Sequence, residues 1–230
     1  LERHQVEQLV VRPHVVVEQR VDVVEGGGGA DTVDATGGGN NDITDSTGND
    51  SVTAGIGSDT IKPGAGADTI ASGGGNDDVR AGSGADTVTA GAGNDSIIGG
   101  GGADTINMGA GSDSADGGAG NDVFQVAANG DQIAADTITG GADTNRIDFT
   151  GAAAVTATFD FDNITDVLTL QNAGDNLGQT RNITFSPIAE TVAQTVALNV
   201  SSSTAAVTTV NNSARSTTTF NMTGGTAGDD

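Results

Sequence analysis

The sequence predicts an all-β protein, in which flattened coils stack so that short strands form two parallel sheets, followed by a β-rich, sandwich-like C-terminal region. Between residues 26 and 125, a phrase of glycine, aspartate, a hydroxyl residue and an aliphatic residue returns about every nine positions, eleven times in all. Of 37 glycines, 28 lie at positions 26–120, whereas all six phenylalanines lie at position 124 or later. We therefore expect a strand-rich N-terminal cap or extension at 1–25, a repeat domain at 26–125 and a Thr/Val/Ala-rich β domain at 126–230.

The charge balance narrows the range of partners. The chain carries 31 acidic residues against 8 Lys and Arg, a formal net charge of −23. Nucleic acids and anionic membranes attract basic surfaces, so we expect cations instead. There is no Cys to form a disulfide, and no apolar run approaches the ~20 residues that span a bilayer. The first residues contain neither Met nor a signal pattern, which suggests a processed piece or export without an N-terminal signal.

Each copy of the phrase is typical of a turn followed by a very short strand. The glycines permit positive φ in the turn, and the Thr/Ser–aliphatic triplet suits a strand whose middle residue faces inward. Two copies make one coil of 18 residues, and alternate copies then stack in the same sheet. The sequence predicts one inward aliphatic side chain per strand, in two rows: Val52, Ile70, Val88, Ile106 and Phe124 in one, and Ile61, Val79, Ile97 and Ala115 in the other.

The aspartates of the repeat predict a metal site. Aspartates 18 residues apart would stack about 4.8 Å apart on one edge of the sheets. Two charges at that distance repel by roughly 3.5 kcal/mol at an effective dielectric of about 20, while each small core side chain supplies only ~1.5–3 kcal/mol before entropy is subtracted. We therefore expect a divalent cation between successive coils. The strictly spaced residues are Asp50, Asp59, Asp68, Asp77, Asp86, Asp95, Asp104, Asp113 and Asp122.

An all-oxygen site of carboxylates and backbone carbonyls favours Ca²⁺, whereas zinc and copper would require His or Cys, which the repeats lack. Seven pairs of aspartates 18 apart predict seven fully Asp-paired sites, from 50–68 to 104–122. Asn41 with Asp59 predicts a weaker site, because an amide oxygen is neutral. Asp31 and Asp50 are 19 apart, since Ala35 is an extra residue, and that site is left open.

The phrase resembles the RTX (repeats-in-toxin) calcium-binding nonapeptide, G-G-x-G-x-D-x-U-x, over residues 26–125. The resemblance implies a parallel β-roll, export by bacterial type I secretion and folding outside the cell. It also implies Ca²⁺ ligation by the carbonyls of the glycines four and two positions before each Asp. These are Gly55, Gly57, Gly64, Gly66, Gly73, Gly75, Gly82, Gly84, Gly91, Gly93, Gly100, Gly102, Gly109, Gly111, Gly118 and Gly120.

The chain departs from the pattern at the first glycine of the phrase, which is mostly Ala, Ser or Met here, Pro63 in one copy and Asp45 in another. Ser46 replaces the second glycine, and we expect weaker binding in those copies. The alternative to a folded roll is a disordered Gly/Asn/Asp-rich spacer. The aliphatic residue two positions after each Asp argues against a spacer, although disorder is the state expected without Ca²⁺.

The flanks predict further strands. Val6, Val15, Val24 and Val33 are spaced by nine, which indicates a strand-rich cap or a continued solenoid without metal sites; chance is the alternative in so Val-rich a segment. His4 and His14 are interpreted as two exposed histidines rather than a metal pair. Beyond residue 126, alternating segments at 154–162, 192–200, 205–210 and 216–222 predict strands.

No catalytic motif is present: the chain has no HExxH, GxSxG or phosphate-binding GxxxxGK[ST], and we expect no enzyme activity. Acids outside the repeat are interpreted as solvated loop residues rather than an acid–base pair: Asp131, Asp136, Asp143, Asp148, Asp160, Asp162 and Asp166.

Three functions remain compatible with the sequence. The first, which we favour by resemblance to RTX-bearing surface-layer proteins and adhesins, is a secreted or cell-surface structural protein of a bacterial surface layer, fibre or adhesin. Ca²⁺ would make it a rigid rod, and it would self-associate into arrays or filaments. The second is the calcium-binding module of a secreted enzyme. The third is ice binding, through a partial hydroxyl ladder on one sheet at Ser51/Thr53, Thr69/Ala71, Thr87/Thr89 and Thr105/Asn107.

Overall fold

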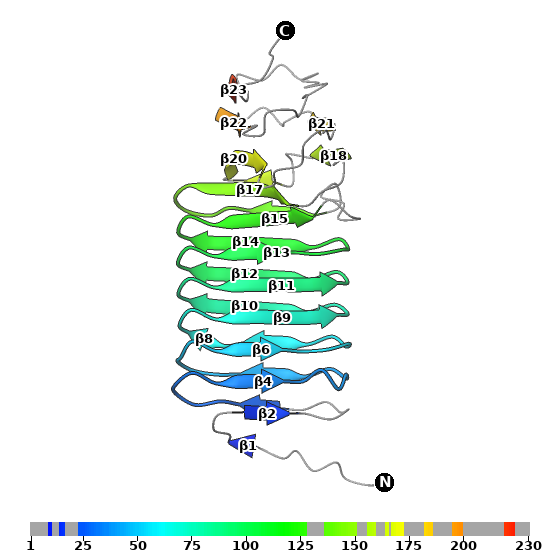
Figure 1. Cartoon of the computed structure of the whole chain (residues 1–230), viewed down its shortest axis with the longest axis vertical. Coiled ribbons are helices and arrows are strands. Elements are labelled where there is room, and N and C mark those ends of the chain that lie inside the picture. Colours follow the sequence, from blue (N-terminus) through cyan, green and yellow to red (C-terminus); the bar gives the residue numbers. More distant parts are fainter. Residues whose placement is uncertain are drawn as a thin grey trace.

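The strands of the protein stack along one axis, from the N-terminal to the C-terminal end (Figure 1). This computed structural model describes residues 9–10, 14–16, 23–127, 136–150, 156–159, 164–165, 167–172, 182–185, 195–199 and 219–223, with side chains at 26–125 and 136–148. These residues contain 23 strands and no helix. The predicted all-β class and parallel β-roll are confirmed.

Two parallel sheets contain most of the strands, and successive strands of the repeat alternate between them, except that β7 and β8 both lie in the first sheet. The first sheet consists of β1 (Leu9–Val10), β3 (Val23–Glu25), β5 (Asp42–Thr44), β7 (Thr60–Lys62), β8 (Gly64–Ala65), β10 (Asp78–Ser83), β12 (Ser96–Gly101), β14 (Ser114–Ala119), β16 (Thr137–Thr139) and β19 (Ile164–Thr165). The second consists of β2 (His14–Val16), β4 (Thr32–Asp34), β6 (Ser51–Thr53), β9 (Thr69–Gly74), β11 (Thr87–Ala92), β13 (Thr105–Asn107), β15 (Val123–Ala127), β17 (Asn145–Thr150), β20 (Val167–Asn172), β22 (Thr195–Asn199) and β23 (Thr219–Thr223). A separate pair joins β18 (Thr156–Phe159) and β21 (Asn182–Phe185).

The coil of the central repeats is 18 residues long, as the spacing predicts. Val79 on β10 lies beside Ile97 on β12, which lies beside Ala115 on β14. Each strand begins with a backbone hydrogen bond to the coil before it, such as Ser96 N–H to the carbonyl of Asp77 at 2.8 Å. Each repeat therefore stacks on the repeat two positions earlier in sequence.

The core lies between the two sheets. Both predicted rows of aliphatic side chains are at most 2% exposed. The expectation of a single inward side chain per strand is wrong, because several strands run for six residues and the residue two positions further along also faces inward. This second row includes the buried residues Ala54, Pro63, Ser72, Ala81, Ala90 and Met108.

Extra residues leave the sheet register intact. The coil that contains Ala35 has 19 residues, yet Thr32 on β4 still pairs with Ser51 on β6. The chain turns at residues 36–37 and then passes through Gly38 and Gly39, both at positive φ, so the extra residue is absorbed outside the strands. A later coil has five more residues than the standard one, but Ser114 on β14 still pairs with Thr137 on β16.

The sheets extend on both sides of residues 26–125. Towards the N-terminus, Val15 pairs with Val33, and Val24 pairs with Ile43. Leu9 is the partner of Val24 on the other side, while Val6 and His4 lie outside the described residues. Of His14, only the backbone on β2 is described.

Towards the C-terminus, β16 and β17 continue the two sheets past the boundary predicted at residue 125. Beyond them, β20, β22 and β23 join the second sheet in parallel. The segments predicted at 154–162, 192–200 and 216–222 contain β18, β22 and much of β23, whereas 205–210 lies outside the described residues. The division into domains and a sandwich-like C-terminal region remain predictions.

Candidate metal centre

A buried aspartate stands at the end of each glycine turn from Asp50 to Asp122, directly before the next strand. In a typical turn, Gly82 and Gly84 adopt φ of +115° and +137°, a region that side-chain-bearing residues rarely enter. The turn then places Asp86 immediately before β11. Every strictly spaced aspartate from Asp50 to Asp122 is at most 3% exposed. A carboxylate so deeply buried requires compensation.

Hydrogen bonds join these aspartates into two ladders, one along each edge of the stack. The backbone N–H of Asp68 donates to Asp86 Oδ1 at 2.8 Å, and the N–H of Asp86 donates to Asp104 Oδ1 at 2.9 Å. The first ladder contains Asp31, Asp50, Asp68, Asp86, Asp104, Asp122 and Asn145. The second contains Asn41, Asp59, Asp77, Asp95, Asp113 and Asp136. Each ladder carboxylate after Asp31 thereby has one oxygen, Oδ1, satisfied within the protein, whereas Asp31 contributes only its backbone N–H.

The second carboxylate oxygen is buried without a hydrogen-bond partner. This holds for Oδ2 of Asp45, Asp50, Asp59, Asp68, Asp77, Asp86, Asp95, Asp104, Asp113 and Asp122. An unsatisfied buried oxygen is costly, and costlier still when it carries charge. A cation bound between successive coils would supply the missing partner for this regular column of oxygens.

Backbone carbonyls lie within reach of these oxygens. A Cβ placed on Gly99 would lie 2.5 Å from Asp104 Oδ2 and 2.7 Å from the carbonyl oxygen of Gly117 in the next coil. The same construction on Gly117 gives 2.3 Å to Asp122 Oδ2 and 2.8 Å to the Gly140 carbonyl. Carboxylate and carbonyl oxygens therefore converge between coils, and this all-oxygen set fits Ca²⁺.

The glycine carbonyls predicted as ligands divide into two groups. Carbonyls four positions before an aspartate accept hydrogen bonds from the next coil, as Gly55 O does from Gly74 N–H at 2.8 Å. Among the described residues, carbonyls two positions before an aspartate, from Gly57 to Gly120, accept no backbone hydrogen bond. The second group consequently retains more capacity for a cation.

Asn41 shows how an amide substitutes at a ladder position. Its Nδ2 donates to the carbonyl of Gly39 at 3.1 Å and to Asp59 Oδ1 at 2.9 Å. The amide group thus bridges a turn carbonyl and the carboxylate of the next coil, as a cation would in other coils. We call each N–H to Oδ1 hydrogen bond between successive ladder residues a rung. Asp31 keeps its rung despite the extra residue, since its N–H donates to Asp50 Oδ1 at 2.8 Å.

Three ladder-associated residues were not predicted as ligands. Asp136 and Asn145 lie 23 residues after Asp113 and Asp122, which hides them from a search for an 18-residue spacing. The triplet Asp136-Thr137-Ile138 matches Asp68-Thr69-Ile70 and was the available signal. Asp45 stands where other copies of the phrase carry a small inward residue. The signal for Asp45 was therefore its position within the copy and not its distance from other aspartates.

Asparagines in the position before the aspartates form a separate, exposed ladder that the sequence did not suggest. Asn76 Oδ1 accepts from Asn94 N–H at 2.8 Å, and Asn94 Oδ1 accepts from Ser112 N–H at 3.0 Å. Asn49 bonds to Ala67 N–H in the same way at 2.9 Å. These contacts hold successive turns together without contributing charge.

The other acidic residues are only partly described. The interpretation of these acids as solvated loop residues is wrong for Asp136, which is buried in the second ladder, and for Asp148, which is 5% exposed on β17. Asp148 Oδ1 accepts a hydrogen bond from Arg146 Nε at 3.0 Å, whereas Asp143 is an exposed turn residue with φ of 72°. Asp131, Asp160, Asp162 and Asp166 lie outside the described residues. The absence of catalysis therefore remains a prediction. Within the described ranges, no helix is long and apolar enough to cross a membrane.

Burial raises the pKa of Asp95 and Asp104 from 3.8 to about 6, and neighbouring aspartates add to the rise while backbone hydrogen bonds oppose it. The folded chain thus holds these protons more tightly than the unfolded chain. Stabilisation by protonation is complete below about pH 4 and is lost as the pH rises through about 6. We expect calcium-free protein to gain β-sheet signal by circular dichroism between about pH 7.5 and about pH 5.

The same protons compete with cations, so we expect the calcium affinity to fall over that pH range. Parallel Ca²⁺ titrations at each pH measure this effect. A calcium-free β signal that decreases on mild acidification would contradict the assignment of the buried carboxylates.

Comparison with known families agrees with the repeat. Residues 21–38, 35–70, 71–106, 99–133 and 134–151 match the model of the RTX calcium-binding nonapeptide repeat, so the matched segments together extend from residue 21 to 151. Comparisons with curated proteins and with solved structures give no match.

Proposed function

Because the chain belongs to the family of RTX calcium-binding nonapeptide repeats, we propose that it is an extracellular structural protein which Ca²⁺ folds into a rigid rod. In this proposal, the rod takes part in a bacterial surface layer, fibre or adhesin, and the chain leaves the cell by type I secretion. The observation that carries the proposal is the pair of buried carboxylate ladders, with an unsatisfied oxygen on each ladder aspartate from Asp50 to Asp122.

Ca²⁺ would lie between successive coils, held by Oδ2 of the ladder aspartates and by the carbonyls of the glycine turns. Seven fully Asp-paired positions would take seven ions, and these would contribute +14 against the formal charge of −23. Neutralisation on this scale is what allows so many carboxylates to lie inside a narrow stack.

Folding would then depend on the compartment. Extracellular calcium-binding modules have dissociation constants of about 10⁻⁴–10⁻³ M, so the chain would remain extended where Ca²⁺ is scarce and fold where it is abundant. An extended chain suits passage through a narrow exporter, and a folded solenoid suits a structural role.

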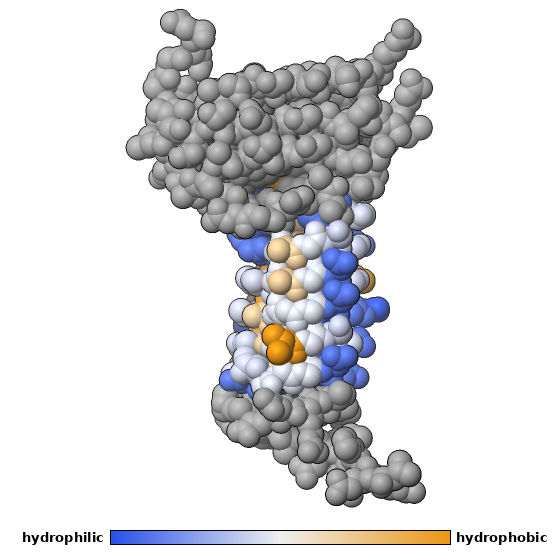
Figure 2. Space-filling model, turned by 90° about the vertical axis from the view of Figure 1, so that its right-hand side faces the viewer, coloured by the Kyte–Doolittle hydropathy of each residue, from blue (hydrophilic) through white to orange (hydrophobic). Residues whose placement is uncertain are grey.

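Assembly would occur through the ends and edges of the stack. A solenoid leaves unpaired strand edges at its ends, which can pair with another copy. Among the described residues, the exposed large hydrophobic side chains are Ile56 and Ile98, at 74% and 38% exposure. The face shown in Figure 2 accordingly has one small strongly hydrophobic area beside a polar column, which favours association through strand edges over a broad apolar face.

Two alternatives remain. The chain could be the calcium-binding module of a secreted enzyme whose catalytic domain lies elsewhere. Ice binding is supported by Thr69, Thr87 and Thr105, which lie in register on the second sheet. The neighbouring positions are Ala71 and Asn107, so the paired ladder of hydroxyls is incomplete. Thermal hysteresis that requires the three threonines would favour this alternative.

Small-angle X-ray scattering and electron microscopy together test the proposal. In millimolar Ca²⁺ we expect a rod-shaped scattering particle and, at high concentration, ordered arrays or filaments. In chelator we expect an expanded chain without assemblies, and Mg²⁺ serves as the control ion. Dispersed monomers at every concentration in Ca²⁺ would contradict the assembly, whereas an identical scattering profile with and without Ca²⁺ would contradict calcium-coupled folding.

A further inference from the structure

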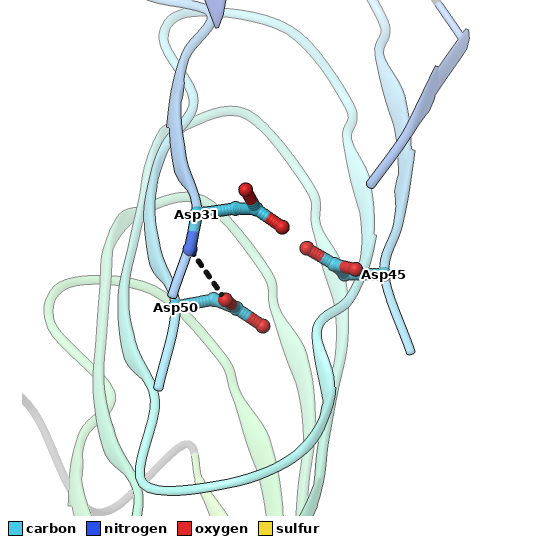
Figure 3. A group of neighbouring side chains, drawn as sticks. All are labelled: Asp31, Asp45 and Asp50. Atoms are coloured by element: carbon cyan, nitrogen blue, oxygen red, sulfur yellow. Dashed lines mark hydrogen bonds between the residues drawn. The ribbon is translucent and has the colours of Figure 1, made fainter. Parts of the chain in front are cut away.

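Asp45 places a third carboxylate beside the first rung of the first ladder. It occupies the position at which other copies carry a small inward residue, such as Ala54 or Ala81. Figure 3 shows the side chains of Asp31, Asp45 and Asp50 facing one another, with Asp45 approaching from the opposite side of the coil. One carboxylate oxygen from each of the three lies within 4.8 Å of the others.

These separations suit a single hard cation. Oxygens bound to one Ca²⁺ at 2.3–2.6 Å are at most about 5 Å apart, so all three carboxylates can reach one ion. Asp50 is 2% exposed, and its Oδ2 is buried without a partner. Oδ2 of Asp45 is likewise buried and unsatisfied. The remaining oxygens are in use, since Asp50 Oδ1 accepts from Asp31 N–H at 2.8 Å and Asp45 Oδ1 accepts from Ser46 N–H at 2.7 Å.

The surrounding backbone makes room for the third carboxylate. A Cβ on Gly26 would come within 2.1 Å of Asp45 Oδ2, so the absence of a side chain at position 26 creates the space that Asp45 fills. The ion pairs formed by described residues involve Arg80 with Asp78 and Arg146 with Asp148, and neither reaches this cluster. No protein cation among the described residues offsets the three charges.

We propose that Asp31, Asp45 and Asp50 form a three-carboxylate cation site that differs from the other rungs, binds Ca²⁺ most tightly and also accepts a trivalent lanthanide ion. This reverses the weaker binding that the sequence predicts for this copy, because Asp45 adds a charged ligand. This inference rests on the proposed calcium-coupled folding. Affinity at hard-oxygen sites rises with the number of charged ligands, and three carboxylates balance a trivalent charge. Because this site binds most tightly in the proposal, its coil, at the N-terminal end of the first ladder, is the first to fill as Ca²⁺ rises.

Three variants of the full chain test the site. Asp45→Asn removes the third charge with little change of size. Gly26→Ala keeps all charges but takes the space of the Asp45 carboxylate. Asp42→Asn is the matched control, because Asp42 is an exposed acid on β5 only three residues away. Competition with a chromophoric chelator gives the Ca²⁺ affinity classes, and the luminescence lifetime of directly excited Tb³⁺ gives the water count at the tightest site.

For the wild-type chain and Asp42→Asn, we expect one site at least about tenfold tighter than the rest. Asp45→Asn and Gly26→Ala should lose that class, and Tb³⁺ at the remaining sites should carry more water, while saturating Ca²⁺ still induces the β signal. An unchanged tight class in Asp45→Asn would overturn the three-carboxylate site and leave calcium-coupled folding standing. Failure of the wild-type chain to fold with Ca²⁺ would instead refute the proposed function.

Discussion

Removal of calcium is expected to abolish most of the β-sheet signal of the chain, and return of millimolar Ca²⁺ is expected to restore it cooperatively. The reason is the uncompensated charge inside the stack. Ladder carboxylates about 4.8 Å apart repel by roughly 3.5 kcal/mol per neighbouring pair at an effective dielectric of about 20. Their second oxygens also lose water on burial without gaining a partner. Far-UV circular dichroism during a CaCl₂ titration of chelator-treated protein measures the effect, with Mg²⁺ as the control.

A ladder variant connects this transition to particular residues. Asp86 accepts from Asp68 and donates to Asp104, so Asp86→Asn weakens two adjacent cation positions in the middle of the first ladder. We expect the Ca²⁺ midpoint of folding to rise several-fold. Asp116→Asn removes the same charge from an exposed position on β14 and should leave the midpoint unchanged. A β signal already complete in chelator would refute the calcium assignment of the ladder aspartates.

The fold of the repeat could be predicted from the sequence because each feature that determines it is local. A glycine turn, a buried aspartate and an inward aliphatic residue recur at fixed positions, and stacking follows once alternate copies share a sheet. The burial of Ile61, Val79 and Ile97 therefore agrees with the period alone. The second inward row was missed because strand length depends on pairing with neighbouring coils, which the nine-residue phrase does not encode.

The parts of the candidate site that were missed depend on tertiary contacts. Asp136 enters the second ladder because Ser114 and Thr137 stay in register although their coil is five residues longer than the standard one. The carboxylate of Asp45 reaches Asp31 and Asp50 across the coil, through space left by Gly26. A rule based on spacing along the chain predicts neither of these contacts. Tolerance of extra residues in the turns also explains why Asp31 and Asp50 keep their rung at a separation of 19.

Gly102→Ala is expected to disrupt the stack severely, whereas Gly101→Ala, one residue earlier, is expected to be tolerated. Gly102 has φ of +138°, and a Cβ there would lie 1.6 Å from the carbonyl oxygen of Gly84 in the preceding coil. That oxygen belongs to the turn that precedes Asp86, so the clash cannot be relieved by a side-chain rotation. Gly101 has nothing within 4 Å of its Cβ position and pairs with Ser83 and Ala119, which already carry side chains.

We expect Gly102→Ala to lower the free energy of unfolding in saturating Ca²⁺ by about 3 kcal/mol or more and to raise the Ca²⁺ midpoint, because displaced coils separate the ligands of one site. Gly101→Ala should change the free energy of unfolding by no more than about 1 kcal/mol. Thermal and calcium titrations followed by circular dichroism measure both quantities. Equal effects of the two variants would mean that the coils are not held at this close spacing. Every ladder contact between coils depends on that spacing, so the proposed cation positions between coils would then be wrong.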